Sequence, residues 1–571
     1  MAISQTEIPP YELSDVPDVK ALPFHERARL IGRMWASQQN ATPFSVIVMY
    51  WLKYLLLFAG GWAFFNTFSS TYTSLLDVGS WAFTPVAFQK ALVWAMFYEC
   101  LGLGCSSGPM NARFWPPIGG LLHFLRPGTT KLALYPKLPV LGGSTRSVFD
   151  VVLYSVHMLF LLRALLSPAI TPDLLVPTCI ILPILGVADK TIFLAARSEH
   201  YLIGIICMAG AFAGGVWIAA CQILWCCIWF WAATSKLNHH FPSVIMVMMN
   251  NGPFFPAFLK NRLFVNYPDD LRPSKFATFM AHLGTATEYA IPFILLLSDS
   301  TALTGGMLFV AFGFHGFIAL NNPSGMPIEW NILMVYGAIF LFGFNPEVSV
   351  LSVAEVPWLA ALMFCSLILL PLYGNFVPSR VSFLLSMRYY AGNWAYNIWF
   401  FRGDSAKKIN KLKKAAGTMR EQLEGMIDDP LAVETVMMST PAIRLAHLQG
   451  KALFDAIPHA MDNVDEYEWM EGEIVAGLAL GWNFGDGHLN ETRLLEVIQE
   501  QCGFEEGELR VVMVESQPLF GRAMHWKAVD AVTGVLAEGD ALIEKMRKEQ
   551  PWPTGDSARP FIDAVARKSA G

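Results

Sequence analysis

Ionisable side chains recur in three consecutive apolar segments near the middle of the chain, where they could take part in proton transfer. Lys236 closes the stretch "WFWAATSKLNHHF", His282 and Glu288 lie in "FATFMAHLGTATEYAIPF", and His315 lies in "FGFHGFIALNN". A lysine that is partly removed from water has a lowered pKa and can act as a base, and a neighbouring histidine can relay the proton. We therefore take Lys236, His282, Glu288 and His315 as the candidate catalytic residues.

Each of these residues also has a structural explanation. A lysine at the end of an apolar helix commonly extends its ammonium to the lipid headgroups, so Lys236 could be an interfacial anchor. A carboxylate such as Glu288 could make only a hydrogen bond between helices. A second set of polar residues near segment ends is a candidate for contact with lipid headgroups or for an ordered loop alone; it comprises His239, His240, Asn322, Arg113 and Arg126.

The nine cysteines predict neither a disulfide framework nor a metal site. Most of them lie inside apolar runs, where cysteine behaves as a small hydrophobic side chain. No Cys-x-x-Cys sequence occurs, and the adjacent pair at 226–227 cannot form a chelate alone. We expect no metal ligands.

The composition predicts a membrane protein. Hydrophobic residues make up 54% of the chain and charged residues only 15%, against roughly 25% charged residues in soluble proteins. Several apolar runs reach the ~20 residues that a helix needs to cross a bilayer. We therefore expect a mainly α fold, a polytopic bundle of about nine or ten transmembrane helices, rather than a barrel of short alternating strands.

Nine apolar segments are the expected spans, and two further features leave the count open. The segments are 44–66, 85–104, 147–167, 174–190, 202–235, 276–298, 301–321, 328–345 and 351–375. The long segment 202–235 could be one tilted helix, a helix broken at Gly214–Gly215, or two short spans. The stretch "VSFLLSMRYYAGNWAYNIWFFR" contains Arg388 and could be a tenth span or a helix in the membrane interface.

Lysine and arginine are unevenly distributed between the connections. They are frequent in the N-terminal arm and absent from the connections 67–84 and 168–173. Because cytoplasmic loops are enriched in these residues, we expect a multi-pass protein of the inner cell membrane with a cytoplasmic N-terminus. Lys236 would then lie on the outer side if 202–235 is a single span. The charged groups Asp189–Lys190 and Arg197–Glu199–His200 are expected in a solvated cytoplasmic turn.

The composition changes after about residue 403. We expect an N-terminal arm at 1–43, a transmembrane domain at 44–402 and a small soluble α+β domain at 403–571. Within the last, 471–485, 508–517 and 522–546 are expected strands, and 490–504 is an expected helix with Asn490 as its N-cap. Acidic residues outnumber basic ones here, which argues against nucleic acid as a partner.

Two stretches carry a resemblance to a known superfamily. "WAATSKLNHHF" and "FHGFIALNNPSGMPIEWNILMVY" resemble segments of the vitamin K-dependent γ-carboxylases and of related horizontally transferred transmembrane (HTTM) domain proteins. The whole chain also resembles a family of multi-pass membrane proteins from actinobacteria and other bacteria. The first resemblance implies that Lys236 is a base that deprotonates a quinone cofactor in its reduced form, with His315 as a weaker correspondence. "NHHF" departs from the superfamily's acidic and tryptophan pattern, and peptide carboxylation is not expected.

Three functions remain open on these grounds. The first is an integral membrane enzyme that acts on a lipid or quinol by proton abstraction. The second is a component that binds or transports membrane lipids without catalysis, or a scaffold of a cell-envelope complex, with a protein partner at the C-terminal domain. The third is a proton-coupled transporter, for which a helix broken at Gly214–Gly215 would be a sign.

Overall fold

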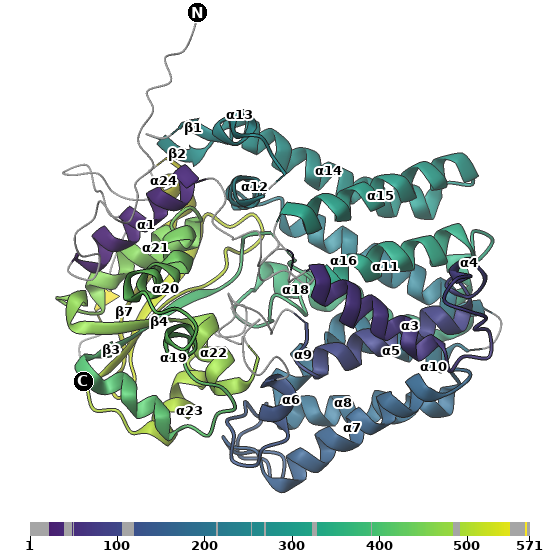
Figure 1. The fold of residues 1–571 in the computed structure, drawn as a ribbon, viewed down its shortest axis with the longest axis horizontal. Coiled ribbons are helices and arrows are strands. Elements are labelled where there is room, and N and C mark those ends of the chain that lie inside the picture. Colours follow the sequence, from purple (N-terminus) through teal and green to yellow (C-terminus); the bar gives the residue numbers. More distant parts are fainter. Residues whose placement is uncertain are drawn as a thin grey trace, which may run out of the picture.

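A computed structural model describes residues 22–38, 48, 51–104, 119–212, 215–252, 254–267, 270–321, 328–389, 391–482, 491–548 and 566–567. Arg113, Asn322 and Asn490, which the sequence analysis singled out, lie outside these residues. A bundle of apolar helices forms one part of the molecule, and a β-sheet with its own helices contacts one end of that bundle (Figure 1).

The helices of the bundle run side by side (Figure 1). Among the described residues, five helical segments are long and apolar enough to cross a membrane: α7 (Val148–Leu166), α11 (Val216–Ser235), α14 (Lys275–Leu297), α15 (Thr301–Asn321) and the segment Pro357–Phe376, which contains α17 (Pro357–Phe364) and α18 (Leu370–Phe376). Shorter apolar elements accompany them: η3 (Tyr54–Ala59), α3 (Gly60–Asn66), α5 (Pro85–Cys100), α8 (Pro172–Ala188), α10 (Ile203–Gly210), α16 (Ile328–Ala338) and η7 (Ile339–Gly343). The prediction of a mainly helical membrane fold is confirmed.

The bundle has a buried centre and an apolar outer face. Almost every residue of α5 and α11 is buried. In contrast, α14 and α15 expose large apolar side chains such as Phe279 (60%), Leu297 (77%) and Phe309 (77%). Exposed apolar surface of this extent is unfavourable in water but suits contact with lipid chains.

The expected segment 202–235 consists of two helices. α10 ends at Gly210 and α11 begins at Val216, with Gly215 as its N-cap in the left-handed conformation (φ 77°). The Trp217 amide donates to the Ala211 carbonyl (3.1 Å), which closes the turn between the two packed helices. The chain therefore reverses its direction here, and a single tilted helix is the wrong interpretation.

The connections between helices gather at two opposite ends. At one end the Phe83 and Phe344 rings stack (4.5 Å), and the Ser70 amide donates to the Pro168 carbonyl (2.9 Å). The other end of the bundle faces the sheet (Figure 1). α11 runs toward this second end, so Lys236 lies on the side of the C-terminal sheet.

The sheet has six antiparallel strands in the order β4-β3-β5-β6-β7-β8. The strands are β3 (Tyr396–Arg402), β4 (Tyr467–Glu471), β5 (Leu509–Val514), β6 (Ala523–Asp530), β7 (Gly534–Leu542) and β8 (Ala566–Arg567). The helices of this region include α20 (Pro430–Arg444), α21 (Leu448–Ala456), α22 (Gly472–Leu480), α23 (Arg493–Cys502) and α24 (Ile543–Lys548). We call residues 391–548 with 566–567 the C-terminal sheet region.

The N-terminal helix packs on the C-terminal sheet region. In α1 (Phe24–Gln38), the Phe24 ring stacks on Phe454 (5.5 Å), and Arg27 forms an ion pair with Glu434 (3.1 Å). The Phe24 amide also donates to a side-chain oxygen of Asp465 (2.7 Å). The two ends of the described chain therefore lie at the same end of the bundle.

The stretch around Arg388 is neither a tenth span nor an interfacial helix. Residues 381–389 form turns, and the following apolar residues form β3, the second strand of the sheet. All of β3 except its last residue is buried, since β4 and β5 flank it and helices cover it. Its apolar and aromatic residues are therefore those of a central strand. The sheet begins seven residues before 403, the expected start of the C-terminal domain.

The remaining expectations for the C-terminal part had mixed outcomes. The strands expected in 508–517 and 522–546 are present as β5, β6 and β7, and the helix expected in 490–504 is α23, with Thr492 as its N-cap. The strand expected at 471–485 is wrong, because 472–480 form helix α22. Residues 474–480 are continuously apolar, and periodicity alone does not distinguish a buried strand from a buried helix.

Close helix packing at Gly337 gives the first prediction. A Cβ atom at Gly337 would lie 2.4 Å from the Trp225 ring, whereas a Cβ at Gly305 would meet nothing within 4 Å. Replacing Gly337 by Leu should therefore overpack the contact between α16 and α11 and lower the free energy of unfolding by about 1–3 kcal/mol. Gly305→Leu should leave it nearly unchanged. Equal thermal unfolding of both variants in detergent would contradict the packing described here.

Candidate functional site

Lys236 and Glu288 form an ion pair inside the bundle. Lys236 follows the last residue of α11, Glu288 lies in the middle of α14, and the Lys236 ammonium donates to Glu288 Oε2. Only 3% of Lys236 and 4% of Glu288 is exposed. Lys236 therefore points into the bundle, and its ammonium does not extend to the surface as an interfacial anchor would.

Aromatic rings surround the ammonium. Its Nζ lies 5.2 Å from the centre of the Phe241 ring and 5.8 Å from that of Phe314. Both distances are within the range in which a ring face attracts a cation. The Lys236 Nζ is therefore in contact with two ring faces and with the Glu288 carboxylate.

His315 is held by hydrogen bonds at both ring nitrogens. The Trp229 indole donates to His315 Nε2 (2.9 Å), and His315 Nδ1 lies 2.9 Å from Asn331 Oδ1. An indole N–H can only donate, so Nε2 must be the acceptor and Nδ1 must carry the proton that is donated to Asn331. His315 is thus a neutral imidazole of fixed orientation beside the ion pair.

A cavity of about 270 Å³ lies on the lysine side of the ion pair. Lys236 and Thr287 supply the polar groups of its wall. The other lining residues are apolar: Phe241, Ile245, Met248, Met280, Leu283, Gly284, Val310, Phe314, Phe317 and Ile318. Leu283 (48% exposed) and Val310 (39% exposed) belong to the outer face of α14 and α15, so the cavity reaches the lateral surface of the bundle. We call it the lateral cavity.

A second cavity of about 30 Å³ lies on the carboxylate side of the pair. Four polar residues line it: Glu288, His315, Asn331 and Tyr389. We call it the inner cavity. Lys236 lines only the lateral cavity and Glu288 only the inner one, so the ion pair stands between the two spaces.

The other candidate residues lie elsewhere. His282 and His239 are exposed, and neither lines the lateral or the inner cavity. His240 is buried, and its ring nitrogens contact Gln449 Oε1 (3.1 Å) and Gln517 Oε1 (2.9 Å) of the C-terminal sheet region. The exposed Arg126 donates to the Lys414 carbonyl (2.8 Å) of the same region. In this structure His240 and Arg126 join the two parts of the chain.

Another buried charged cluster corrects an expectation of the sequence analysis. Arg197, Glu199 and His200 are at most 5% exposed, and Arg197 lies 3.6 Å from Glu99. The Tyr389 hydroxyl donates to Glu199 Oε1 (3.0 Å). These residues therefore belong to the interior, because partners from two other segments, Glu99 and Tyr389, lie against the turn that we expected to be solvated.

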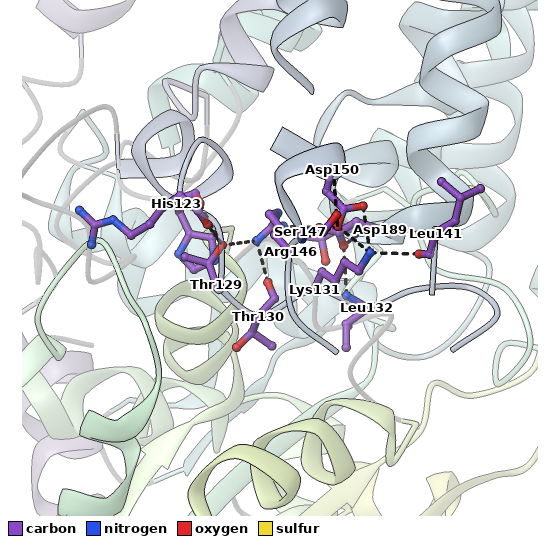
Figure 2. Close-up of polar contacts among 12 residues, drawn as sticks. His123, Thr129, Thr130, Lys131, Leu132, Leu141, Arg146, Ser147, Asp150 and Asp189 are labelled. Atoms are coloured by element: carbon purple, nitrogen blue, oxygen red, sulfur yellow. Dashed lines mark hydrogen bonds and ion pairs between the residues drawn. The ribbon is translucent and has the colours of Figure 1, made fainter. Parts of the chain in front are cut away.

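A third group of buried charges holds the loop after α6 (Gly119–Phe124), as Figure 2 shows. Lys131 donates to both carboxylate oxygens of Asp150 (2.8 and 2.9 Å), and Arg146 pairs with Asp189. Arg146 also donates to the Thr130 carbonyl (2.7 Å). Each charge has a partner of opposite sign within the loop or at the start of a helix. This pattern indicates that the ion pairs stabilise the loop.

The ion pair gives the second prediction. Glu288→Leu leaves the Lys236 ammonium buried without its carboxylate and should lower the free energy of unfolding by about 3–5 kcal/mol. The double variant Lys236→Met/Glu288→Leu replaces both charges with apolar groups and should recover most of that loss. Both single variants, Lys236→Met and Glu288→Leu, the double variant and the wild type are compared by thermal unfolding in one detergent. A double variant as unstable as the sum of both single variants would contradict the pairing.

Comparison with known proteins places the chain among membrane proteins. A family model described as "Transmembrane protein of unknown function (DUF3556)" matches residues 1–561. Neither the curated proteins nor the solved structures give a match. The family match carries no link to HTTM proteins or γ-carboxylases. The chain therefore belongs to the DUF3556 family of transmembrane proteins.

Proposed function

We propose that the protein binds an amphipathic membrane lipid in the lateral cavity. The acyl chain would lie against the apolar wall, and the polar group would meet the Lys236 ammonium. The observation that carries the proposal is the position of Lys236, a buried cation in the wall of a cavity that is otherwise almost entirely apolar. A few placed polar groups in an apolar wall are typical of small-molecule sites.

The size and wall of the lateral cavity favour a single chain. Its volume of about 270 Å³ is at the lower end of the range for ligand sites, roughly 300–1,000 Å³. The site would accept one acyl chain, while the rest of a larger lipid stays in the bilayer beyond Leu283 and Val310. Met248 and Met280 are flexible side chains that adapt to chains of different shape.

The ion pair favours binding over proton abstraction by Lys236. The Lys236 Nζ already donates to Glu288 Oε2, and its other N–H groups suit an anionic or hydrogen-bond-accepting head group. Proton abstraction from a quinol would compete with this contact, because the nitrogen must then accept a proton rather than donate one to Glu288. We therefore favour the second of the three hypotheses, lipid binding without catalysis, over an enzyme or a proton-coupled transporter.

We further propose that the sheet end of the bundle faces the cytoplasm of an inner cell membrane. No lysine or arginine occurs in 67–84, 167–171, 298–300, 344–356 or between α10 and α11, and the described residues of these connections lie at the opposite end. Such a bias orients membrane proteins with the basic end inside. With α10 and α11 as separate crossings, ten crossings would leave both the N-terminal helix and the C-terminal sheet region in the cytoplasm.

Lipid binding is tested with oleate and oleyl alcohol as probes. Gly284 lines the cavity and has room for a larger side chain, since the nearest atom to a Cβ there is 3.8 Å away. Gly284→Leu should fill the cavity and weaken binding of both probes about tenfold or more, measured by native mass spectrometry of delipidated protein. Lys236→Met should weaken oleate binding about ten- to a hundredfold, since a hydrogen bond to a charged group contributes ~1.5–3 kcal/mol. The same variant should weaken the binding of oleyl alcohol by a smaller factor.

Two matched variants control this experiment. Gly313→Leu adds the same side chain at an exposed position of α15 with free space around it. Lys90→Met removes another buried lysine, which donates to the Phe65 carbonyl (2.8 Å) away from the cavity. Both controls should bind the probes as the wild type does. Unchanged binding by Gly284→Leu would refute the site.

The orientation is tested by labelling introduced cysteines in intact cells with a membrane-impermeant maleimide. Glu347→Cys places a thiol in an exposed connection far from the sheet, and Lys407→Cys places one in the C-terminal sheet region. The first should react in intact cells and the second only after lysis. The reverse pattern would contradict the proposed orientation.

A further inference from the structure

The inner cavity has the size and chemistry of a water site. Its volume of about 30 Å³ exceeds the ~10–15 Å³ that one water needs. A buried water also needs two to four polar partners, and Glu288, His315, Asn331 and Tyr389 line the space. Because both nitrogens of His315 are already bonded, Glu288 and Tyr389 are the lining groups that would exchange a proton with such a water.

Tyr389 connects this cavity to a second carboxylate. Its hydroxyl donates to Glu199 Oε1 (3.0 Å), and its ring packs edge-on against Trp330 (4.2 Å), which fixes its direction. Glu199 belongs to η5 (Ser198–Leu202) and is 5% exposed. The groups therefore form a series that runs from the Glu288 carboxylate through the inner cavity and the Tyr389 hydroxyl to Glu199.

We propose that this series is a proton relay, in which one water in the inner cavity and the Tyr389 hydroxyl carry a proton between Glu288 and Glu199. In one direction, protonated Glu288 gives its proton to the water, the water gives a proton to the tyrosine oxygen, and the hydroxyl proton passes to the Glu199 carboxylate. No other bond changes, and one negative charge moves from Glu199 to Glu288.

The relay deepens the proposed function and rests on it. Glu288 is the partner of Lys236, which faces the lateral cavity, so a proton that reaches Glu288 is one step from a bound head group. The ligand class that makes use of such a path is an amphiphile whose head group is a weak acid and exchanges a proton in the site. Glu199 in turn lies near the Arg197 guanidinium, which attracts its carboxylate, and near Glu99, which repels it.

The relay is tested without any ligand, by time-resolved infrared spectroscopy of the protein in liposomes after a rapid change of pH. The carboxyl bands of Glu288 and Glu199 are assigned by their loss in Glu288→Gln and Glu199→Gln. A relay changes the rate of proton transfer and not the equilibrium between the two forms of Glu288, so Glu199→Gln should slow the change of the Glu288 band about tenfold or more. The groups that face Glu288 include Lys236, His315 and Tyr289, and those that face Glu199 include Arg197, Tyr389, Glu99 and Tyr201.

Tyr389→Phe distinguishes a relay from a general field effect, because it removes the hydroxyl that carries the proton and changes no formal charge. It should slow the change of the Glu288 band about tenfold or more and leave the titration midpoint of that band nearly unchanged. Tyr154→Phe is the matched control, since the Tyr154 hydroxyl donates to the Cys100 carbonyl (2.6 Å) and lines neither cavity; it should preserve the wild-type rate. A Glu288 band that does not change with pH, or one that changes at the same rate with and without the Tyr389 hydroxyl, would overturn the relay, and neither result bears on lipid binding.

Discussion

A lysine and a carboxylate that leave water together must remain in contact, because either charge alone inside an apolar bundle would cost several kcal/mol. This constraint ties Lys236 at the end of α11 to Glu288 in the middle of α14. It fixes how these helices meet, and it holds a cation in the wall of the lateral cavity. The position of this ion pair determines the separation of the two cavities, the surroundings of His315 and the route to Tyr389.

The C-terminal sheet region completes the membrane part at the same end. After α18 the chain forms the mostly buried turns at 381–389 and then enters β3, so the helices and the sheet are neighbours along the chain. His240, four residues after Lys236, contacts Gln449 and Gln517 of that region. A displacement of the sheet would therefore also move the end of α11, where the ion pair lies.

Much of the site follows from the sequence because a buried charge requires a partner. Lys236, Glu288 and His315 are polar residues in consecutive apolar segments, and the structure brings them together. His282 does not belong to the site. It lies six residues before Glu288 on the same helix, and therefore about 120° away around the helix axis. Tyr389 and Trp229 could not be found this way, because aromatic residues are common in apolar segments. The turn 197–200 looked solvated, since the residues that enclose it come from distant parts of the chain.

The errors in element type have a similar origin. The apolar stretches 381–402 and 471–485 carry no periodicity that separates a buried strand from a buried helix. The first became turns and a central strand, and the second became α22. The break at 211–215, by contrast, has a local cause in Gly215, whose left-handed conformation starts α11, and the sequence offered it among the alternatives.

Lys236 lines the lateral cavity, and we propose that its ammonium faces a lipid there. A cryo-electron microscopy map of the protein extracted with its native membrane lipids tests it most directly. We expect a continuous chain-shaped density between α12 (Phe241–Asn251), α14 and α15, with one end within hydrogen-bonding distance of Lys236 Nζ, and no such density in the Gly284→Leu variant. A cavity filled by repacked side chains, or a density that Gly284→Leu leaves unchanged, would contradict the claim.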